Sequence, residues 1–266
     1  MILNCPICTG KLNFAFEEKV LCKYDAIFDS CQVCGLLMAR DPHWLDEAYT
    51  SAIASTDTGL VMRNNSIGRK LASVLFGVLS ERGTGRYADM AGGYGMLTRV
   101  MRDYGFDFYW VDKYCSNLMA RGFEYDSKIG PCIAVTAIEI MEHLEDPLEF
   151  VREAFKITNS DVFIFTTEIF EGSPPPLNWW YYSFETGQHI AFYKIKTLEM
   201  MAGKLGLYFV SAGGIHIFSK HKINLNMLKL ATSRLSILIV WLLRKVLSTK
   251  VMQDHYAMVN YINNKK

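Results

Sequence analysis

The sequence predicts an α/β protein built on a mostly parallel sheet, with a small cysteine-containing module before it and a helical, apolar and basic tail after it. Two observations indicate this class. Between residues 86 and 220, short apolar runs alternate with stretches whose apolar residues recur at helical spacing. One run, residues 133–138, is apolar without alternation, as expected for a strand buried on both faces. We divide the chain into residues 1–42, 43–85, 86–220 and 221–266.

Composition narrows the class further. Half of the 266 residues are apolar and 21% are charged, so the chain can bury a substantial core. The formal net charge of +1 gives no reason to expect a nucleic-acid partner. The first residues lack the features of a signal peptide, and no run of about 18 uncharged apolar residues is present. We therefore expect a cytoplasmic protein with reduced thiols.

Residues 1–42 contain two C-x-x-C pairs, Cys5 with Cys8 and Cys31 with Cys34. Two such pairs can complete a closed tetrahedral site, which structural zinc prefers. So short a segment buries little surface, and a metal is the expected source of its stability. Four sulfur ligands leave no open position for catalysis. We predict a zinc-ribbon-like module, with redox or disulfide use of the cysteines as the alternative.

Residues 43–85 predict a linker and packing helices. A short amphipathic helix is expected over residues 44–54, and apolar spacing predicts a longer helix over residues 67–79. The alternative is a flap over the ligand site, with Tyr49, Asp57, Thr58 and Arg63 facing that site.

A glycine-rich turn follows the first strand of the α/β domain. Asp89 ends the apolar run, and Gly92, Gly93 and Gly95 precede a helix expected over residues 96–104. Glycines let the backbone approach a ligand closely, and a helix N-terminus adds its dipole. Asp112 closes the next strand, 23 residues after Asp89, where a carboxylate suits ribose hydroxyls. The pattern predicts a nucleoside ligand.

A third polar position follows the strand at residues 133–138, where Glu139 stands. The glycine turn, Asp112 and Glu139 all fall at predicted carboxyl ends of strands, which is where open α/β sheets bind ligands. Further strands are expected at residues 161–166, 207–212 and 215–218, and helices at residues 148–157 and 197–205.

Three motifs together resemble the class I S-adenosylmethionine (SAM) dependent methyltransferases over about residues 67–220. They are Asp89-Met90-Ala91-Gly92-Gly93-Tyr94-Gly95, Val111-Asp112, and Val135 to Glu139 followed by Glu142-His143-Leu144. The resemblance implies a Rossmann-like, seven-stranded, mostly parallel sheet. It also implies that the Gly92–Gly95 loop, with Asp89 before it, holds the methionine part of SAM, that Asp112 binds the ribose, and that Glu139 lies beside the sulfonium and the acceptor.

A cysteine module ahead of such a domain resembles the bacterial methyltransferases of deoxysugar and surface-polysaccharide pathways. In the nucleotide-sugar C-methyltransferases of that group, a Glu-His element supplies the base. This chain has Glu185 to Tyr193 in that place, with Gln188 where the group has an acid. We therefore expect O-methylation of a sugar-like or other small hydroxyl acceptor. The alternatives are C-methylation of a nucleotide-linked deoxysugar, RNA methylation, and a zinc-containing binding module without catalysis.

Methyl transfer to a hydroxyl needs alignment and a base, and histidine suits the second task. His189 and His143 are the candidates, and His189 is favoured because it follows an aromatic stretch behind a triple proline. A structural, hydrogen-bonded role is the alternative for each. The predicted acceptor contacts are Trp179, Trp180, Tyr181, Tyr182, Tyr193, Tyr49 and Arg63, with at least two of the consecutive aromatics expected in the core.

Residues 225–247 are apolar and helix-compatible, with Lys229, Arg234, Arg244 and Lys245 interspersed. Three interpretations remain: a helix packed on the domain, a homodimer seam, or a helix lying on a membrane surface. Contact with the inner face of the membrane would suit an enzyme working near lipid-linked glycans.

Overall fold

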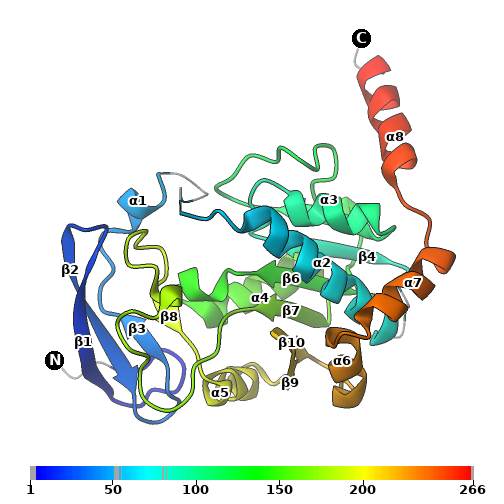
Figure 1. Cartoon of the computed structure of the whole chain (residues 1–266). Coiled ribbons are helices and arrows are strands. Elements are labelled where there is room, and N and C mark those ends of the chain that lie inside the picture. The colour runs from blue at the N-terminus through cyan, green and yellow to red at the C-terminus, as the bar shows by residue number, and fades with distance from the viewer. Residues whose placement is uncertain (1–3, 51–53, 55, 80, 82, 265–266) are drawn as a thin grey trace.

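The computed structural model describes residues 4–50, 54, 56–79, 81 and 83–264. Its centre is a six-stranded sheet in the order β5-β4-β6-β7-β10-β9 (Figure 1). The strands are β4 (Arg86–Met90), β5 (Asp107–Val111), β6 (Ala134–Ile138), β7 (Val162–Thr166), β9 (Tyr208–Ala212) and β10 (Ile215–Ser219). Strands β5, β4, β6 and β7 are parallel to one another, and β10 is antiparallel to both β7 and β9. The α/β class is confirmed.

Within the described residues the sheet has one strand fewer than the seven expected. Beyond β5 the chain makes only an isolated parallel bridge between Trp110 and Glu124. The segment cannot continue as a strand because Asp126 turns it away: its side chain accepts a hydrogen bond from the backbone N–H of Lys128 and caps the short 3₁₀ helix η1 (Ser127–Ile129).

Helices cover both faces of the sheet. One face packs against α2 (Leu60–Gly77) and α3 (Met96–Asp103), and the other against α4 (Pro147–Thr158) and α5 (Ile195–Leu205). Successive strand residues serve opposite faces, as pleating requires. Tyr87 and Ile164 are buried on the α2 side, while their neighbours Ala88 and Phe165 are buried on the α4 side.

The N-terminal module is a second, antiparallel sheet in the order β1-β2-β3-β8 (Figure 1). Its first three strands are β1 (Leu12–Val20), β2 (Tyr24–Cys31) and β3 (Leu37–Ala39). The fourth, β8 (Ala191–Phe192), comes from the loop that follows β7 and pairs with β3. The module and the α/β domain therefore share a sheet, although β3 and β8 lie more than 150 residues apart in the chain.

Both helices between residues 43 and 85 differ in length from the prediction. Helix α1 (Leu45–Ala48) is a single turn within the predicted range of residues 44–54, of which 51–53 and 55 lie outside the described residues. The longer helix α2 begins earlier than the periodicity indicated, at Leu60.

The tail forms three helices: α6 (Leu225–Thr232), α7 (Ser236–Val246) and α8 (Val251–Asn263). The first two replace the single helix expected over residues 225–247. Helices α6 and α7 meet at 91° and pack on α2 through Leu228, Val240 and Leu243. Helix α8 projects away from the body (Figure 1), and Asp254 ties it down through hydrogen bonds from Arg99 and Arg102. Across the described part of the chain, no single helix has the length and apolarity to cross a membrane, and only α6 and α7 taken together reach them.

Candidate active site

The glycine loop leaves β4 in a conformation that few side chains tolerate. Ala91 and Gly93 each have φ of +53°, and Gly95 has φ of +83° at the start of α3. A Cβ on Gly95 would lie 2.6 Å from Oδ1 of Asn117, so glycine is required there. A Cβ on Gly93 would meet nothing within 4 Å. Gly93 therefore marks the open side of the loop, where a ligand can approach the backbone.

Asp112 lies directly against this loop. One oxygen of its carboxylate accepts a hydrogen bond from the backbone N–H of Gly93 at 2.9 Å. The other accepts from the N–H groups of Tyr114 and Cys115 at 2.7 and 2.8 Å. The Trp110 indole N–H also donates to the carbonyl of Gly93 at 2.8 Å. The predicted ribose carboxylate and the predicted methionine loop are thus parts of one rigid unit.

Asp89 supports the loop from below. Its side chain is buried and accepts a hydrogen bond from the Thr136 hydroxyl at 2.6 Å. Burial, with a smaller contribution from the nearby Asp112, raises the pKa of this carboxyl to about 7. A Cβ on Gly92 would lie 3.0 Å from Oδ2 of Asp89 and 2.8 Å from the Trp110 ring, so the loop rests closely on both. The open loop, the N-terminus of α3 and the Asp112 carboxylate fit the parts of SAM that the resemblance assigns to them.

Glu139 follows β6, as expected, in the left-handed region with φ of +54°. Its carboxylate accepts a hydrogen bond from the Thr166 hydroxyl at 2.5 Å, and its own N–H donates to that hydroxyl at 3.0 Å. Burial raises the pKa of Glu139 to about 7, and the Glu142 carboxylate adds to the shift. Thr166, at the end of β7, had no distinguishing signal in the sequence.

The short 3₁₀ helix η2 (Met141–His143) places Glu142 and His143 beside Glu139. Glu142 is 0% exposed, and neither of its carboxylate oxygens makes a well-formed hydrogen bond among the described residues. Burial raises its pKa to about 7, although the nearby hydroxyls of Tyr181 and Thr167 act to lower it. The sequence motif contained Glu142 but assigned it no role; its place directly before a candidate histidine was the available signal.

His143 is oriented by Tyr49. Its Nδ1 lies 2.8 Å from the Tyr49 hydroxyl, and that hydroxyl donates to the carbonyl of Gln188 at 3.5 Å. The contact with Tyr49 occupies Nδ1 of His143. The opposite nitrogen, Nε2, lies 3.9 Å from Oε1 of Glu142. Burial holds the pKa of His143 well below its ordinary value.

His189 completes the cluster from the loop before β8. Its Nδ1 donates to the backbone carbonyl of Tyr181 at 2.6 Å, which leaves Nε2 without a proton. Burial lowers the pKa of His189. The rings of His143 and His189 lie 4.8 Å apart, edge to face. The structure thus brings both candidate histidines to one place.

Arg63 approaches the same place from α2. Its guanidinium holds Asp57 through two hydrogen bonds of 3.0 and 2.7 Å. Its positive charge also lowers the pKa of Glu139 and of Glu142. Tyr49 and Arg63 therefore both face the polar cluster.

The aromatic stretch is mainly a packing element. Tyr182 is buried, stacks on Phe184 at 4.8 Å and packs against strands of the module. Tyr193 is fully buried and donates its hydroxyl to the carbonyl of Met141 at 2.7 Å. Both are core residues, so packing accounts for them where acceptor contact was expected. Trp179 packs in the same cluster, Trp180 is 73% exposed, and Tyr181 alone of the four reaches the histidines, through a ring contact of 4.8 Å with His189.

The four predicted metal cysteines form a second site. Their sulfurs all lie within 4.8 Å of one another, with Cys5 and Cys34 at 3.6 Å and Cys8 and Cys31 at 3.3 Å. Ligands about 2.3 Å from a tetrahedral zinc stand about 3.8 Å apart, so this donor set fits the ion. The Thr197 hydroxyl donates to the carbonyl of Cys34 at 2.9 Å, so the turn that contains the second C-x-x-C pair is held against α5.

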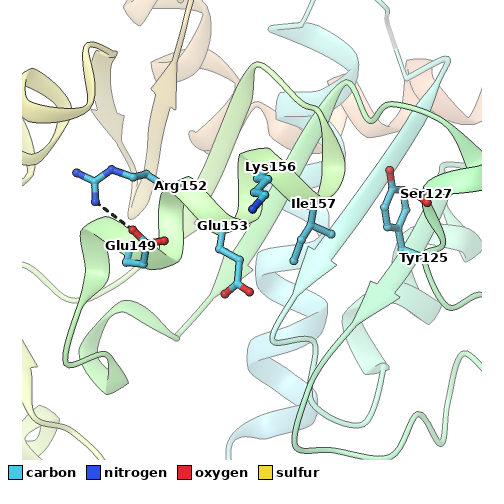
Figure 2. A pocket seen from close by; sticks show the side chains of 7 residues that line it. All are labelled: Tyr125, Ser127, Glu149, Arg152, Glu153, Lys156 and Ile157. Atoms are coloured by element: carbon cyan, nitrogen blue, oxygen red, sulfur yellow. Dashed lines mark hydrogen bonds and ion pairs between the residues drawn. The ribbon is translucent and has the colours of Figure 1, made fainter.

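A hollow of about 530 Å³ lies beside α4 and is lined by none of the residues of either site. Figure 2 shows the side chains that line it. Two ion pairs involve its charged side chains: Arg152 with Glu149 at 3.3 Å, and Glu153 with Lys113 at 2.6 Å. It contains none of the predicted site residues, and we assign it no function.

The sheet, the glycine loop and the opposed Asp112 carboxylate define a class I SAM-dependent methyltransferase. A family model described as a methyltransferase domain matches residues 64–212, more than half of the 266 residues. The chain belongs to that family. Comparison with the curated proteins finds no match.

Solved structures with a similar fold include TnmH, with 16% identity and a TM-score of 0.46 over 66% of this chain and 60% of that one. The small RNA methyltransferase HEN1 has 16% identity and a TM-score of 0.40 over 65% of this chain and 27% of that one. Magnesium protoporphyrin IX methyltransferase from Synechocystis PCC 6803, with bound SAH, has 14% identity and a TM-score of 0.41 over 66% of this chain and 91% of that one. This chain covers less than two thirds of the TnmH and HEN1 chains.

Proposed function

We propose that this protein transfers the methyl group of SAM to a hydroxyl oxygen of a sugar-like or other small acceptor in glycan or surface-polysaccharide biosynthesis. The observation that carries the proposal is the polar cluster of Glu139, Glu142, His143 and His189. Glu139 follows β6, and β6 lies beside β4, the strand that leads into the glycine loop and its contact with Asp112. The glycan class of acceptor is supported by the resemblance of the cysteine module and the Glu185–Tyr193 segment to sugar methyltransferases.

In this proposal the glycine loop and Asp112 hold SAM, which when bound supplies a methyl carbon made electrophilic by the adjoining positive sulfur. The hydrogen bond from Nδ1 of His189 to Tyr181 fixes the ring so that Nε2 can accept a proton. The acceptor hydroxyl gives its proton to Nε2, and its oxygen forms the bond to the methyl carbon. The carbon–sulfur bond breaks with its electron pair on sulfur.

Transfer to oxygen is favoured over transfer to carbon by the residue before His189. Gln188 is buried, and its side-chain amide donates to the carbonyl of Ala48 at 2.8 Å. It holds the loop in place and supplies no acid where the sugar C-methyltransferases have one. We also propose that the four cysteines bind a structural zinc, because the cluster is closed and part of the core around α5.

The test is a screen of the full-length protein with SAM against nucleotide sugars and glycan fragments. Methylated products are detected by mass, and the position of the new methyl group by NMR. An O-methylated sugar supports the proposal. Methylation confined to carbon, or transfer only to RNA included as a competing substrate, would contradict it.

A further inference from the structure

Glu142 is an unusual residue, because its carboxylate is buried beside the two candidate histidines. It is an acidic side chain with no exposure, and neither oxygen makes a well-formed hydrogen bond among the described residues. A buried polar group without a partner is costly, and native structures rarely retain one without a reason. Glu142 faces the hydroxyls of Tyr181 and Thr167, which lower its pKa, and the nitrogens of His143 and His189. One donor atom from each of Glu142, His143 and His189 lies within 4.8 Å of the others.

Both histidines are held in the way that metal ligands are held. His143 uses Nδ1 for the Tyr49 hydroxyl, and His189 uses Nδ1 for the Tyr181 carbonyl. In each ring these contacts leave Nε2 available to bind a metal ion. A hydrogen bond from the second nitrogen to a carbonyl or hydroxyl is the usual support of a histidine that binds a metal.

We propose that Glu142, His143 and His189 bind a divalent cation whose open positions receive the hydroxyl of the acceptor. Two imidazoles and one carboxylate suit Zn²⁺, Mn²⁺, Co²⁺ or Fe²⁺ better than Mg²⁺ or Ca²⁺, which prefer oxygen ligands throughout. Three protein ligands leave coordination positions open, in contrast to the closed cluster of four cysteines.

The cation gives the acceptor side a means of selecting hydroxyl substrates. A hydroxyl bound to it is oriented toward the methyl carbon and loses its proton more easily, here to water. In this arrangement Nε2 of His189 binds the cation, so water takes the proton in place of His189. Loss of His189 impairs transfer in either arrangement and does not distinguish a ligand from a general base. The role of the cation rests on the proposed O-methyl transfer, whereas its binding does not and is tested directly.

The test is a titration of the full-length, zinc-loaded protein with Mn²⁺, followed by the EPR signal of free Mn²⁺. Cysteine thiolates prefer softer ions, so Mn²⁺ reports on the nitrogen and oxygen site. We expect one Mn²⁺ per chain, and Glu142→Gln and His189→Asn each to weaken binding at least about 100-fold. Tyr49→Phe, which removes only the support of His143, should weaken it about 10-fold. Glu171→Gln, which changes an exposed carboxylate in the loop after β7, should leave it unchanged.

The site is overturned if the wild-type protein takes up neither Mn²⁺ nor a second equivalent of Zn²⁺, or if Tyr49→Phe binds as tightly as the wild type. The wild-type titration and Tyr49→Phe keep the test decisive if a ligand variant does not fold. Mn²⁺ binding without methyl transfer to any acceptor would refute the proposed function but leave the site in place. Transfer that persists in a protein without Mn²⁺ binding would refute the cation site alone.

Discussion

Replacement of Asp89 by asparagine should stabilise the protein at alkaline pH and leave its stability unchanged in acid. Asp89 is buried, with a pKa of about 7 against an ordinary value of 3.8. The folded state therefore binds a proton that the unfolded state releases, and the unfolding free energy falls as pH rises from about 4 to 7. The full shift corresponds to about 4 kcal/mol above pH 7, at 1.36 kcal/mol per pKa unit.

Asparagine matches the shape of aspartate and carries no charge. Its side-chain carbonyl can still accept the 2.6 Å hydrogen bond that Thr136 donates, so the substitution removes the charge and keeps this contact. Denaturant unfolding of wild type and Asp89→Asn at pH 4 and pH 8 measures the difference. Other buried acids, such as Glu139, titrate in both proteins and largely cancel in the comparison.

We expect nearly equal unfolding free energies at pH 4 and an advantage of up to about 4 kcal/mol for the variant at pH 8. An Asp89→Asn protein that is equally or more strongly destabilised at pH 8 than at pH 4 would refute the reasoning. That result would mean that the carboxylate is paired in the folded state and that burial does not control its charge.

Four further predictions concern ligands and surfaces. Asp112→Ala should weaken SAM binding about 100-fold by calorimetry, because it removes a charged acceptor and releases the N–H of Gly93; equal affinity would exclude Asp112 as a ribose ligand. His189→Ala should lower turnover about 10²–10⁴-fold with little change in the Kd for SAM, and full activity would exclude it from the site. Cys34→Ser should remove the zinc equivalent held by the four cysteines and expose the module to limited proteolysis, whereas a module that lacks this zinc and still resists protease would contradict a structural ion. The full chain should float with anionic vesicles and not with neutral ones, because α7 exposes Trp241 beside Lys245 and residues 225–250 contain basic but no acidic side chains; flotation unchanged in Trp241→Glu would argue against this surface.

Much of the central domain could be predicted from the sequence because its signals are local. Strands buried on both faces, such as β6 and β7, read as short apolar runs. The glycine loop and Asp112 were assigned to strand ends, and the 2.9 Å contact between Gly93 and Asp112 follows from two parallel neighbouring strands. Residue spacing did not predict the structure of the tail, where the same composition is compatible with more than one arrangement of helices. The apolar residues of the tail allow one helix or two, and the break between α6 and α7 depends on packing against α2.

The sequence by itself determined the α/β class, the glycine loop after the first strand of the domain and the four-cysteine motif, since each depends on residue spacing along the chain. Only the tertiary structure decided that the aromatic stretch packs the module onto the domain and that Glu142, His143 and His189 meet. Their meeting depends on the path of the loop before β8, which hydrogen bonds from Trp44 to Gly187 and from Gln188 to Ala48 hold in place. Contacts that join residues about 140 positions apart leave no periodic signal, because they are selected by the energy of the packed chain as a whole.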